Sequence, residues 1–272
     1  MSMGSELWVC NIGQIDYRSA LELQESLRAA RQQELIPDTL LLLEHNPRVY
    51  TRGRRSDPGE LTMGDAFYAA QGIEIIDTNR GGKVTYHGPG QLVGYPIVRV
   101  DDVVAYVRLL EQALVAALAQ EGISARARPD EGPDYTGVWV GERKIASIGV
   151  HVAKGVTTHG FAVNVDNDLT PFSWVVACGL PSVTMTSIVE ESAPAVTPGE
   201  AAGNQTGGAS VAVGCGPASP RMICFRKRAA FALAQALGHR QRLVTLDRLQ
   251  GYAARAEALR SVETVRTGSA VS

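Results

Sequence analysis

The chain has 272 residues, 45% of them hydrophobic, and its 26 Lys and Arg nearly balance 28 Asp and Glu, which leaves a net charge of −2. A compact chain of this size buries about 75% of its unfolded surface, so neither a disulfide nor a metal is needed to stabilise it. The balanced charge argues against bulk nucleic-acid binding, although it leaves room for a local basic patch that receives an acidic partner.

The apolar runs are too short to cross a membrane. The longest ones, Thr39–Leu43 and Leu114–Ala119, fall far below the required length of about 20 residues. Residues 1–10 do not combine a basic stretch with an apolar run, as a signal peptide would. We therefore expect a cytoplasmic protein that binds neither membranes nor nucleic acids.

The cysteines and histidines indicate neither a disulfide framework nor a metal site. No cysteine pair forms CxxC, and the histidines form no HxH or HExxH pattern. We expect no metal and no cofactor. Three cysteines have structural interpretations: Cys10 in a strand core, Cys215 in a loop and Cys224 in helix packing.

The first third of the chain predicts strands, one helix and a basic loop. Asp16 can cap a helix whose apolar side chains recur at helical spacing. Four arginines, Arg48, Arg52, Arg54 and Arg55, lie in the loop. The predicted strands are Leu7–Ile12, Thr39–Glu44 and Gly72–Asp77, and the loop is Asn46–Gly59.

The middle of the chain predicts a helix between strand regions. Leu92–Val100 reads as a strand, and Asp101 or Asp102 caps a helix that presents Val104, Val107, Leu114 and Leu118 on one face and ends by Gly122. Short turns then separate three strands, which predicts an antiparallel meander. These strands are Gly137–Val140, Lys144–Val152 and His159–Val165. Without a regular βαβ alternation, the fold class is α/β in the mixed α+β sense.

The last third contains one segment of a different kind. Glu191–Pro220 is rich in Gly, Ala, Ser, Thr and Pro, with few large apolar side chains, and is predicted to be a flexible loop. Helices are predicted at Arg221–Leu237 and Leu246–Leu259, followed by a frayed tail. We expect a single domain over residues 1–272, with a flexible loop at 191–220.

A glycine-rich stretch, Arg80–Gln91, is the first candidate for chemistry. Paired glycines let a ligand approach the backbone closely, and their N–H groups can face an anion or a carbonyl oxygen. The spacing is neither GxxxxGK[ST] nor GxGxxG, so it is not a known phosphate loop. A plain turn between strands explains the glycines equally well.

Lys144 and Cys178 are the two candidate reactive side chains. Lys144 follows a tight turn and begins an apolar strand, a place where a lysine is usually a solvated edge charge. Cys178 ends an apolar stretch and precedes Gly179, and an unpaired cysteine in such a place is more often a small core residue than a nucleophile. Neither residue alone identifies a reaction.

Together, four segments resemble one family. RGGKVTYHGPGQLVGYP, GERKIASIGVHV, THGFAVNV and PFSWVVACGLP, in this order and spacing, are similar to the lipoyl(octanoyl) transferases of lipoate biosynthesis. The resemblance runs from about Leu7 to Ile188 and, more weakly, through the helix after Arg221. It implies the biotin/lipoate protein ligase fold, a central mixed sheet flanked by helices with a smaller sheet beside it.

The resemblance also implies an activity and its residues. Such enzymes are acyltransferases that move an octanoyl group from acyl carrier protein to a lysine of lipoyl domains, in oxo-acid dehydrogenase complexes and the glycine cleavage H protein. The nucleophile of the family matches Cys178, which would carry the acyl group as a thioester, and its partner lysine matches Lys144. The implied acyl-binding residues are Arg80, Gly81, Gly82, Lys83, Val84, Thr85, Tyr86, His87, Ser147, Ile148, Gly149, Gly160, Phe161 and Ala162.

The chemistry gives these two residues a purpose. A thiolate attacks a thioester, and a free cysteine with a pKa near ~8.5 is mostly protonated at neutral pH, so a nearby ammonium would help. In the second step a neutral Lys144 can take the proton of the incoming amine. Two alternatives stay open: an ATP-dependent lipoate or biotin ligase, which has no use for Cys178, and a non-catalytic acyl-binding module.

Overall fold

The computed structural model describes residues 5–176, 183–192 and 218–268, with side chains in the last helix described as far as Ser261. Cys178 and Cys215 lie outside the described residues, as does most of the predicted loop at 191–220. The ends of that loop differ from the expectation. Glu191 and Ser192 close the helix α4 (Ile188–Ser192), and Pro220 opens α5 (Pro220–Ala236).

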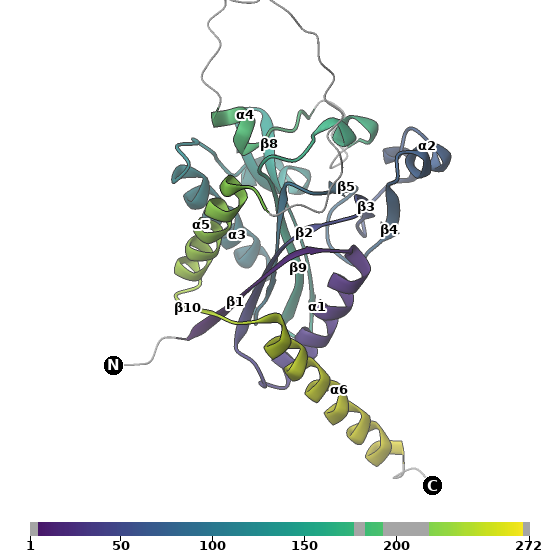
Figure 1. Ribbon diagram of the computed structural model, residues 1–272, viewed down its shortest axis with the longest axis vertical. Coiled ribbons are helices and arrows are strands. Elements are labelled where there is room, and N and C mark those ends of the chain that lie inside the picture. The colour runs from purple at the N-terminus through teal and green to yellow at the C-terminus, as the bar shows by residue number, and fades with distance from the viewer. Residues whose placement is uncertain (1–4, 177–182, 193–217, 269–272) are drawn as a thin grey trace, which may run out of the picture.

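Within the described residues, a seven-stranded sheet forms the centre of the molecule (Figure 1). Its strand order is β10-β1-β2-β6-β9-β8-β7. The first three strands are parallel and the remaining neighbours are antiparallel. The bounds are β1 (Glu6–Ile15), β2 (Asp38–His45), β6 (Gln91–Ile97), β7 (Gly137–Val140), β8 (Arg143–Ala153), β9 (Val156–Asn164) and β10 (Arg240–Leu243).

A smaller sheet packs beside the large one. It has the order β4-β3-β5 in the described residues, with β3 parallel to β4 and antiparallel to β5. Tyr50, Tyr68 and Tyr86 form its core together with Phe172 and Val175. The bounds are β3 (Val49–Arg52), β4 (Glu74–Asp77), β5 (Thr85–His87) and α2 (Asp65–Ala70).

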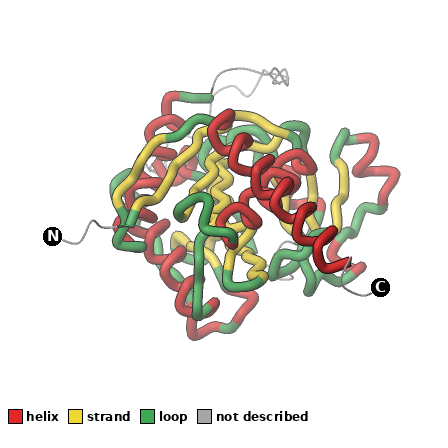
Figure 2. Tube along the Cα trace, turned by 90° about the horizontal axis from the view of Figure 1, so that it is seen from below, coloured by secondary structure: helices red, strands yellow, loops and turns green. Residues whose placement is uncertain are grey.

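Helices cover both faces of the large sheet, as Figures 1 and 2 show. Because successive strand residues point to opposite faces, the leucines of β2 divide between two cores. Leu40 and Leu42 pack with α3 (Val103–Ala119) and α5, whereas Leu41 and Leu43 pack with α1 (Tyr17–Gln32) and α6 (Leu246–Gly268). Short 3₁₀ helices occupy Pro58–Glu60, Pro129–Glu131, Pro133–Tyr135 and Thr170–Trp174.

The predicted mixed α/β class, the helix caps and the meander are confirmed. Asp16 accepts a hydrogen bond from the Ser19 amide, and Asp102 accepts bonds from the amides of Val104 and Ala105. Strands β7, β8 and β9 are consecutive antiparallel neighbours. Cys10 is buried in β1, where burial raises the pKa of its thiol to about 11.

Three local predictions are wrong. The expected loop Asn46–Gly59 contains β3, whose Val49 and Tyr50 are buried because this strand is the middle one of the small sheet. Cys224 is exposed instead of packed, because it lies on the outer side of α5. Val104 is exposed at the start of α3 instead of lying on its buried face.

Among the helices of the described residues, none is both long and apolar enough to span a membrane.

Candidate active site

A cavity of about 480 Å³ opens between β8, β9, the start of α3 and the glycine-rich stretch at residues 80–87. Its volume falls in the range of small-molecule sites. Of the predicted acyl-binding residues, all line this cavity except Tyr86, which instead packs against Tyr50 and Phe172 in the core of the small sheet. Lys144 lines the cavity as well.

The glycines of the cavity allow two backbones to approach each other. The Gly81 amide donates a 2.9 Å hydrogen bond to the Val150 carbonyl, which seats the glycine-rich stretch on β8. A Cβ atom at Gly149 would lie 2.7 Å from the Gly81 carbonyl oxygen, and one at Gly160 would lie 2.3 Å from that of Gly94. Side chains at these positions would therefore push apart the elements that form the cavity wall.

Arg80 holds the glycine-rich stretch to the small sheet. Its guanidinium donates to the carbonyl and hydroxyl oxygens of Thr51 at 2.6 and 2.7 Å, and to the Gly81 carbonyl at 3.0 Å. The side chain is 7% exposed, so these bonds replace the water that a buried cation loses. Arg80 thus fixes the shape of the cavity wall.

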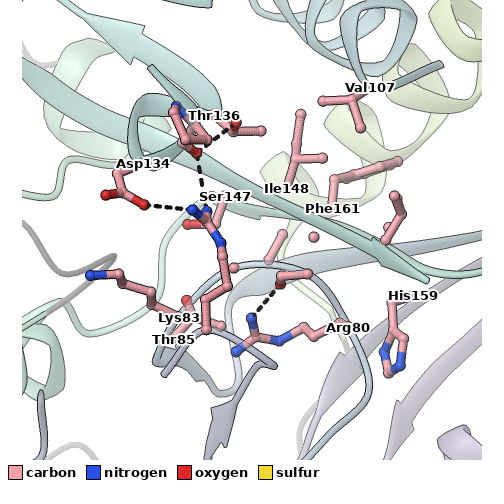
Figure 3. A pocket seen from close by; sticks show the side chains of 18 of the residues that line it. Arg80, Lys83, Thr85, Val107, Asp134, Thr136, Ser147, Ile148, His159 and Phe161 are labelled. Carbon is pink, nitrogen blue, oxygen red and sulfur yellow. Dashed lines mark hydrogen bonds and ion pairs between the residues drawn. The ribbon is translucent and has the colours of Figure 1, made fainter. Parts of the chain in front are cut away.

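One side of the cavity is apolar. Figure 3 shows Val107, Ile148 and Phe161 close together, whereas Lys83 and Asp134 lie at the opposite side of the view. Val150 and Ala162 add to the apolar lining. This surface fits the hydrocarbon part of a ligand.

Buried His87, His159, Tyr17 and Tyr95 form another part of the wall, and His45 packs behind them against His87. Burial lowers the pKa of His45 to about 4 and that of His159 to about 3, and lowers the pKa of His87 well below its usual value. Burial also raises the pKa of Tyr17 to about 12. At neutral pH these side chains are therefore uncharged, and the wall stays compatible with an apolar ligand.

Lys144 is buried, unlike a typical lysine at a strand start. Its side chain is 2% exposed, and its Nζ lies 5.2 Å from the centre of the Trp139 ring. Gly137 packs on its methylene chain, since a Cβ there would lie 2.8 Å from Lys144 Cε. The Gly137 amide in turn donates to the fully buried carboxylate of Glu111.

The chain on both sides of residues 177–182 is fixed near the cavity. On one side, the Val176 amide donates to the carbonyl of Glu60, whose carboxylate accepts from the Val84 amide. On the other side, the Lys144 amide donates to the Thr184 carbonyl, and the Thr186 amide donates to the Lys144 carbonyl, at 2.9 and 3.0 Å. Cys178 itself lies outside the described residues.

The mouth of the cavity is basic on one side. Arg54, Arg55 and Lys83 line it, with Arg55 3.2 Å from Asp134 and Lys83 3.5 Å from Glu60. Of the four arginines noted in the sequence, Arg54 and Arg55 line the cavity. Arg52 instead pairs with Asp77, and Arg48 donates to the Gln71 carbonyl.

Several lining residues were not predicted from the sequence. Tyr95 lies on β6 within the first recognised segment, and the others come from helices and loops outside the recognised motifs: Tyr17, Val103, Val104, Val107, Arg108, Pro129, Gly132, Pro133, Asp134 and Thr136. Val107 lay in a recognised helical pattern, but nothing in that pattern indicates that the first turns of the helix border a cavity.

Comparisons with known proteins agree on one family. Residues 16–203 match the family model described as the lipoyl protein ligase A/B catalytic domain. An octanoyltransferase from Solibacter usitatus (strain Ellin6076) is 55% identical over 173 residues, covering 62% of this chain and 76% of the relative. An octanoyltransferase from Thermobifida fusca (strain YX) is 45% identical over 188 residues, covering 65% and 75%.

Solved structures show the same fold. A putative lipoate protein ligase from T. acidophilum with bound lipoic acid matches with a TM-score of 0.63 at 17% identity, covering 93% of this chain and 94% of the other. A lipoate-protein ligase A bound with ATP matches with a TM-score of 0.62 at 17% identity, covering 93% and 94%. The predicted similarity to lipoate ligases in fold is therefore confirmed.

The buried neutral histidines predict acid sensitivity. Their folded pKa values lie below the unfolded value near 6.5, so the unfolded state binds more protons and stability falls as the pH drops from about 6.5 towards 4. Each histidine adds at most about 1.4 kcal/mol per pH unit to this slope. The free energy of unfolding, measured with urea at pH 7, 6 and 5, should fall less steeply with decreasing pH in His45→Gln than in the parent. His151→Gln, at a half-buried position, should change this pH dependence less. The same pH dependence in the parent and in His45→Gln would contradict the lowered pKa of His45.

Proposed function

This chain belongs to the lipoyl protein ligase A/B catalytic domain family, and we propose that it transfers an octanoyl group to lipoyl domains through a thioester on Cys178. The chain is an acyltransferase, an octanoyltransferase of protein lipoylation, as its 44–55% identity to curated octanoyltransferases indicates. That identity favours transfer over the ATP-dependent ligase reaction. Its protein substrates are lipoyl domains. The thioester, the role of Lys144 and the acyl donor are the proposed parts.

One observation carries the proposal. A buried lysine lines a cavity of about 480 Å³ with one apolar side, and the chain that leads out of the Cys178 segment is hydrogen-bonded to the backbone of that lysine. An octanoyl tail offers about seven carbons beyond its carbonyl, and their burial contributes up to roughly 5 kcal/mol at ~0.8 kcal/mol per methylene. The apolar side formed by Val107, Ile148 and Phe161 suits this tail.

The first half-reaction forms the enzyme thioester. The Cys178 thiolate attacks the carbonyl of the octanoyl thioester, and the donor thiolate leaves from the tetrahedral intermediate. Lys144 in its ammonium form stabilises the attacking thiolate and can give the departing thiolate its proton. Backbone amides of the glycine-rich stretch are candidate donors to the oxyanion.

The second half-reaction regenerates the thiol. The lysine amine of the acceptor domain attacks the thioester carbonyl and forms an amide, while the Cys178 thiolate leaves. A neutral Lys144 takes one proton from the attacking amine and passes it to the departing thiolate. Because the thioester supplies the driving force, neither ATP nor a metal takes part.

We further propose an acyl carrier protein as the donor. Carriers of this class are acidic, and the basic mouth formed by Arg54, Arg55 and Lys83 is complementary to an acidic surface. The acceptors would be lipoyl domains of oxo-acid dehydrogenase complexes and the glycine cleavage H protein.

The thioester predicts an increase in mass. After incubation with octanoyl-acyl carrier protein, without ATP and with a chelator, intact mass should rise by one octanoyl group in the parent and stay unchanged in Cys178→Ser. A label that persists in Cys178→Ser would place the acyl group elsewhere. Octanoylation of a lipoyl domain only with ATP and free octanoate would favour the ligase instead.

Replacement of Lys144 should make Cys178 less reactive. Lys144→Met keeps most of the buried side chain but removes the charge, so the Cys178 pKa should rise by one unit or more, and alkylation at pH 7 should slow by about tenfold. Both proteins should also carry Cys224→Ser and Cys215→Ser, so that alkylation reports on Cys178 and not on another thiol such as the exposed Cys224. Identical pH profiles of alkylation in both proteins would exclude the electrostatic role.

Charge reversal at the mouth should selectively weaken the binding of the carrier protein. Arg54→Glu should raise the KM for octanoyl-acyl carrier protein by roughly tenfold, less at high salt, while a small octanoyl thioester reacts as before. Arg52→Glu serves as the matched control, since Arg52 does not line the cavity. Equal effects of the two variants would rule out docking at the mouth.

A further inference from the structure

A buried chain of amide side chains joins the cavity wall to the backbone of Lys144. Gln91 on β6 and Asn164 on β9 face each other in register, and both are nearly inaccessible to solvent. Gln91 Oε1 lies 2.8 Å from His87 Nδ1, and Gln91 Nε2 donates to Asn164 Oδ1 at 3.0 Å. The first link of this chain is therefore His87, in the wall of the cavity.

The last link reaches the strand-like segment beside Lys144. Asn164 Nδ2 donates to the Thr186 carbonyl at 3.0 Å, and the Thr186 amide donates to the Lys144 carbonyl at 3.0 Å. Thr186 is fully buried, and its hydroxyl donates to Glu191 Oε1 at 2.5 Å. Asn164 thus connects the hydrogen bonds that begin at His87 with those that end at the Lys144 carbonyl.

The direction of every bond in this chain follows from backbone carbonyls, which can only accept. The Thr186 carbonyl requires the NH₂ group of Asn164, so Asn164 Oδ1 must accept from Gln91. Gln91 Nε2 also donates to the Tyr86 carbonyl at 3.2 Å, so Gln91 Oε1 must accept from His87. His87 therefore carries its proton on Nδ1, and Nε2 keeps a lone pair.

We propose that Asn164 is a positioning residue that fixes the Nδ1–H tautomer of His87 and the backbone of Lys144 through one hydrogen-bond network. This proposal rests on the acyl-transfer role of Lys144 given above. Misplacement of a reacting group by about 1 Å can cost roughly 100-fold in rate, so a network that ties two parts of the site together has a measurable effect.

The tautomer can be read without any activity measurement. In protein labelled with ¹⁵N-histidine, the two ring nitrogens of His87, assigned by their loss in His87→Gln, should give the Nδ1–H pattern near neutral pH. Gln91→Met removes the acceptor of that proton, so the His87 signals should shift towards exchange between tautomers. An Nε2–H pattern in the parent would overturn the proposal.

The link to Lys144 can be tested with Asn164→Asp. An ionised carboxylate still accepts from Gln91 but cannot donate to the Thr186 carbonyl, so kcat at pH 8 should fall about 100-fold with little change in KM. A protonated carboxyl can donate again, so the ratio of variant to parent kcat should recover by at least about tenfold as the pH falls. Asn164→Leu, which cannot donate at any pH, should show no recovery.

Controls separate the network from simple destabilisation and from the proposed function. Asn167→Ala removes a 3.3 Å bond to the same Asn164 oxygen but leaves the bond to Thr186, so its kcat should stay within about twofold of the parent. Equal losses in Asn167→Ala and Asn164→Asp, at matched thermal stability, would overturn the proposal. If Asn164→Asp does not fold, the His87 tautomer in Asn164→Leu decides, and an Nδ1–H pattern unchanged from the parent would overturn the role of Asn164. A parent that shows Nδ1–H but transfers no octanoyl group would refute the proposed function and leave the network standing.

Discussion

The close seating of Gly81 on β8 is the contact on which the cavity depends. A backbone hydrogen bond from Gly81 to Val150, together with the absence of a side chain at Gly149, lets the glycine-rich stretch lie directly on the large sheet. Arg80 ties the same stretch to Thr51 in the small sheet. The two sheets thereby share one wall, and the space between that wall and α3 becomes a pocket of fixed width.

Burial makes this pocket suitable for an acyl chain despite its many titratable side chains. His87 and His159 in its wall lose the ability to hold a proton near neutral pH because desolvation lowers their pKa. Arg54, Arg55 and Lys83 lie at the mouth, whereas two further cations of the lining, Arg80 and Lys144, are buried. An apolar interior and a charged entrance thus arise from the same stretch of chain, since Lys83 and His87 are four residues apart.

Much of the fold could be predicted from the sequence, because caps and periodicity are local properties. Asp16 and Asp102 marked the helix starts, and the turns at Gly141 and Gly155 marked the meander. The strand β3 could not be found this way, because Val49–Arg52 is short, lies between arginines, and pairs with strands distant in sequence. The cavity residues of α3 were missed for a similar reason, since Val103 and Val107 face the glycine-rich stretch only through tertiary packing.

The burial of Lys144 shows the limit of local interpretation most clearly. A lysine after a turn is usually exposed, yet Trp139, Gly137 and the segment at Thr184–Thr186 enclose it. The family resemblance singled it out, whereas its surroundings come from β7 and from residues 40 positions later. No pattern around Lys144 itself carries that information.

The pairing of β10 with β1 has a consequence for synthesis of the protein. Residues 240–243 complete the sheet edge beside residues 6–9, and α6 contributes Leu249, Ala253 and Ala256 to the core that covers α1. At about 5–20 residues per second, the ribosome reaches this part of the chain on the order of ten seconds or more after it has made β1. During that interval the part of α1 that packs against α6 and the outer edge of β1 have no native cover. Until its last helix emerges, the nascent chain therefore exposes apolar surface that the folded protein buries.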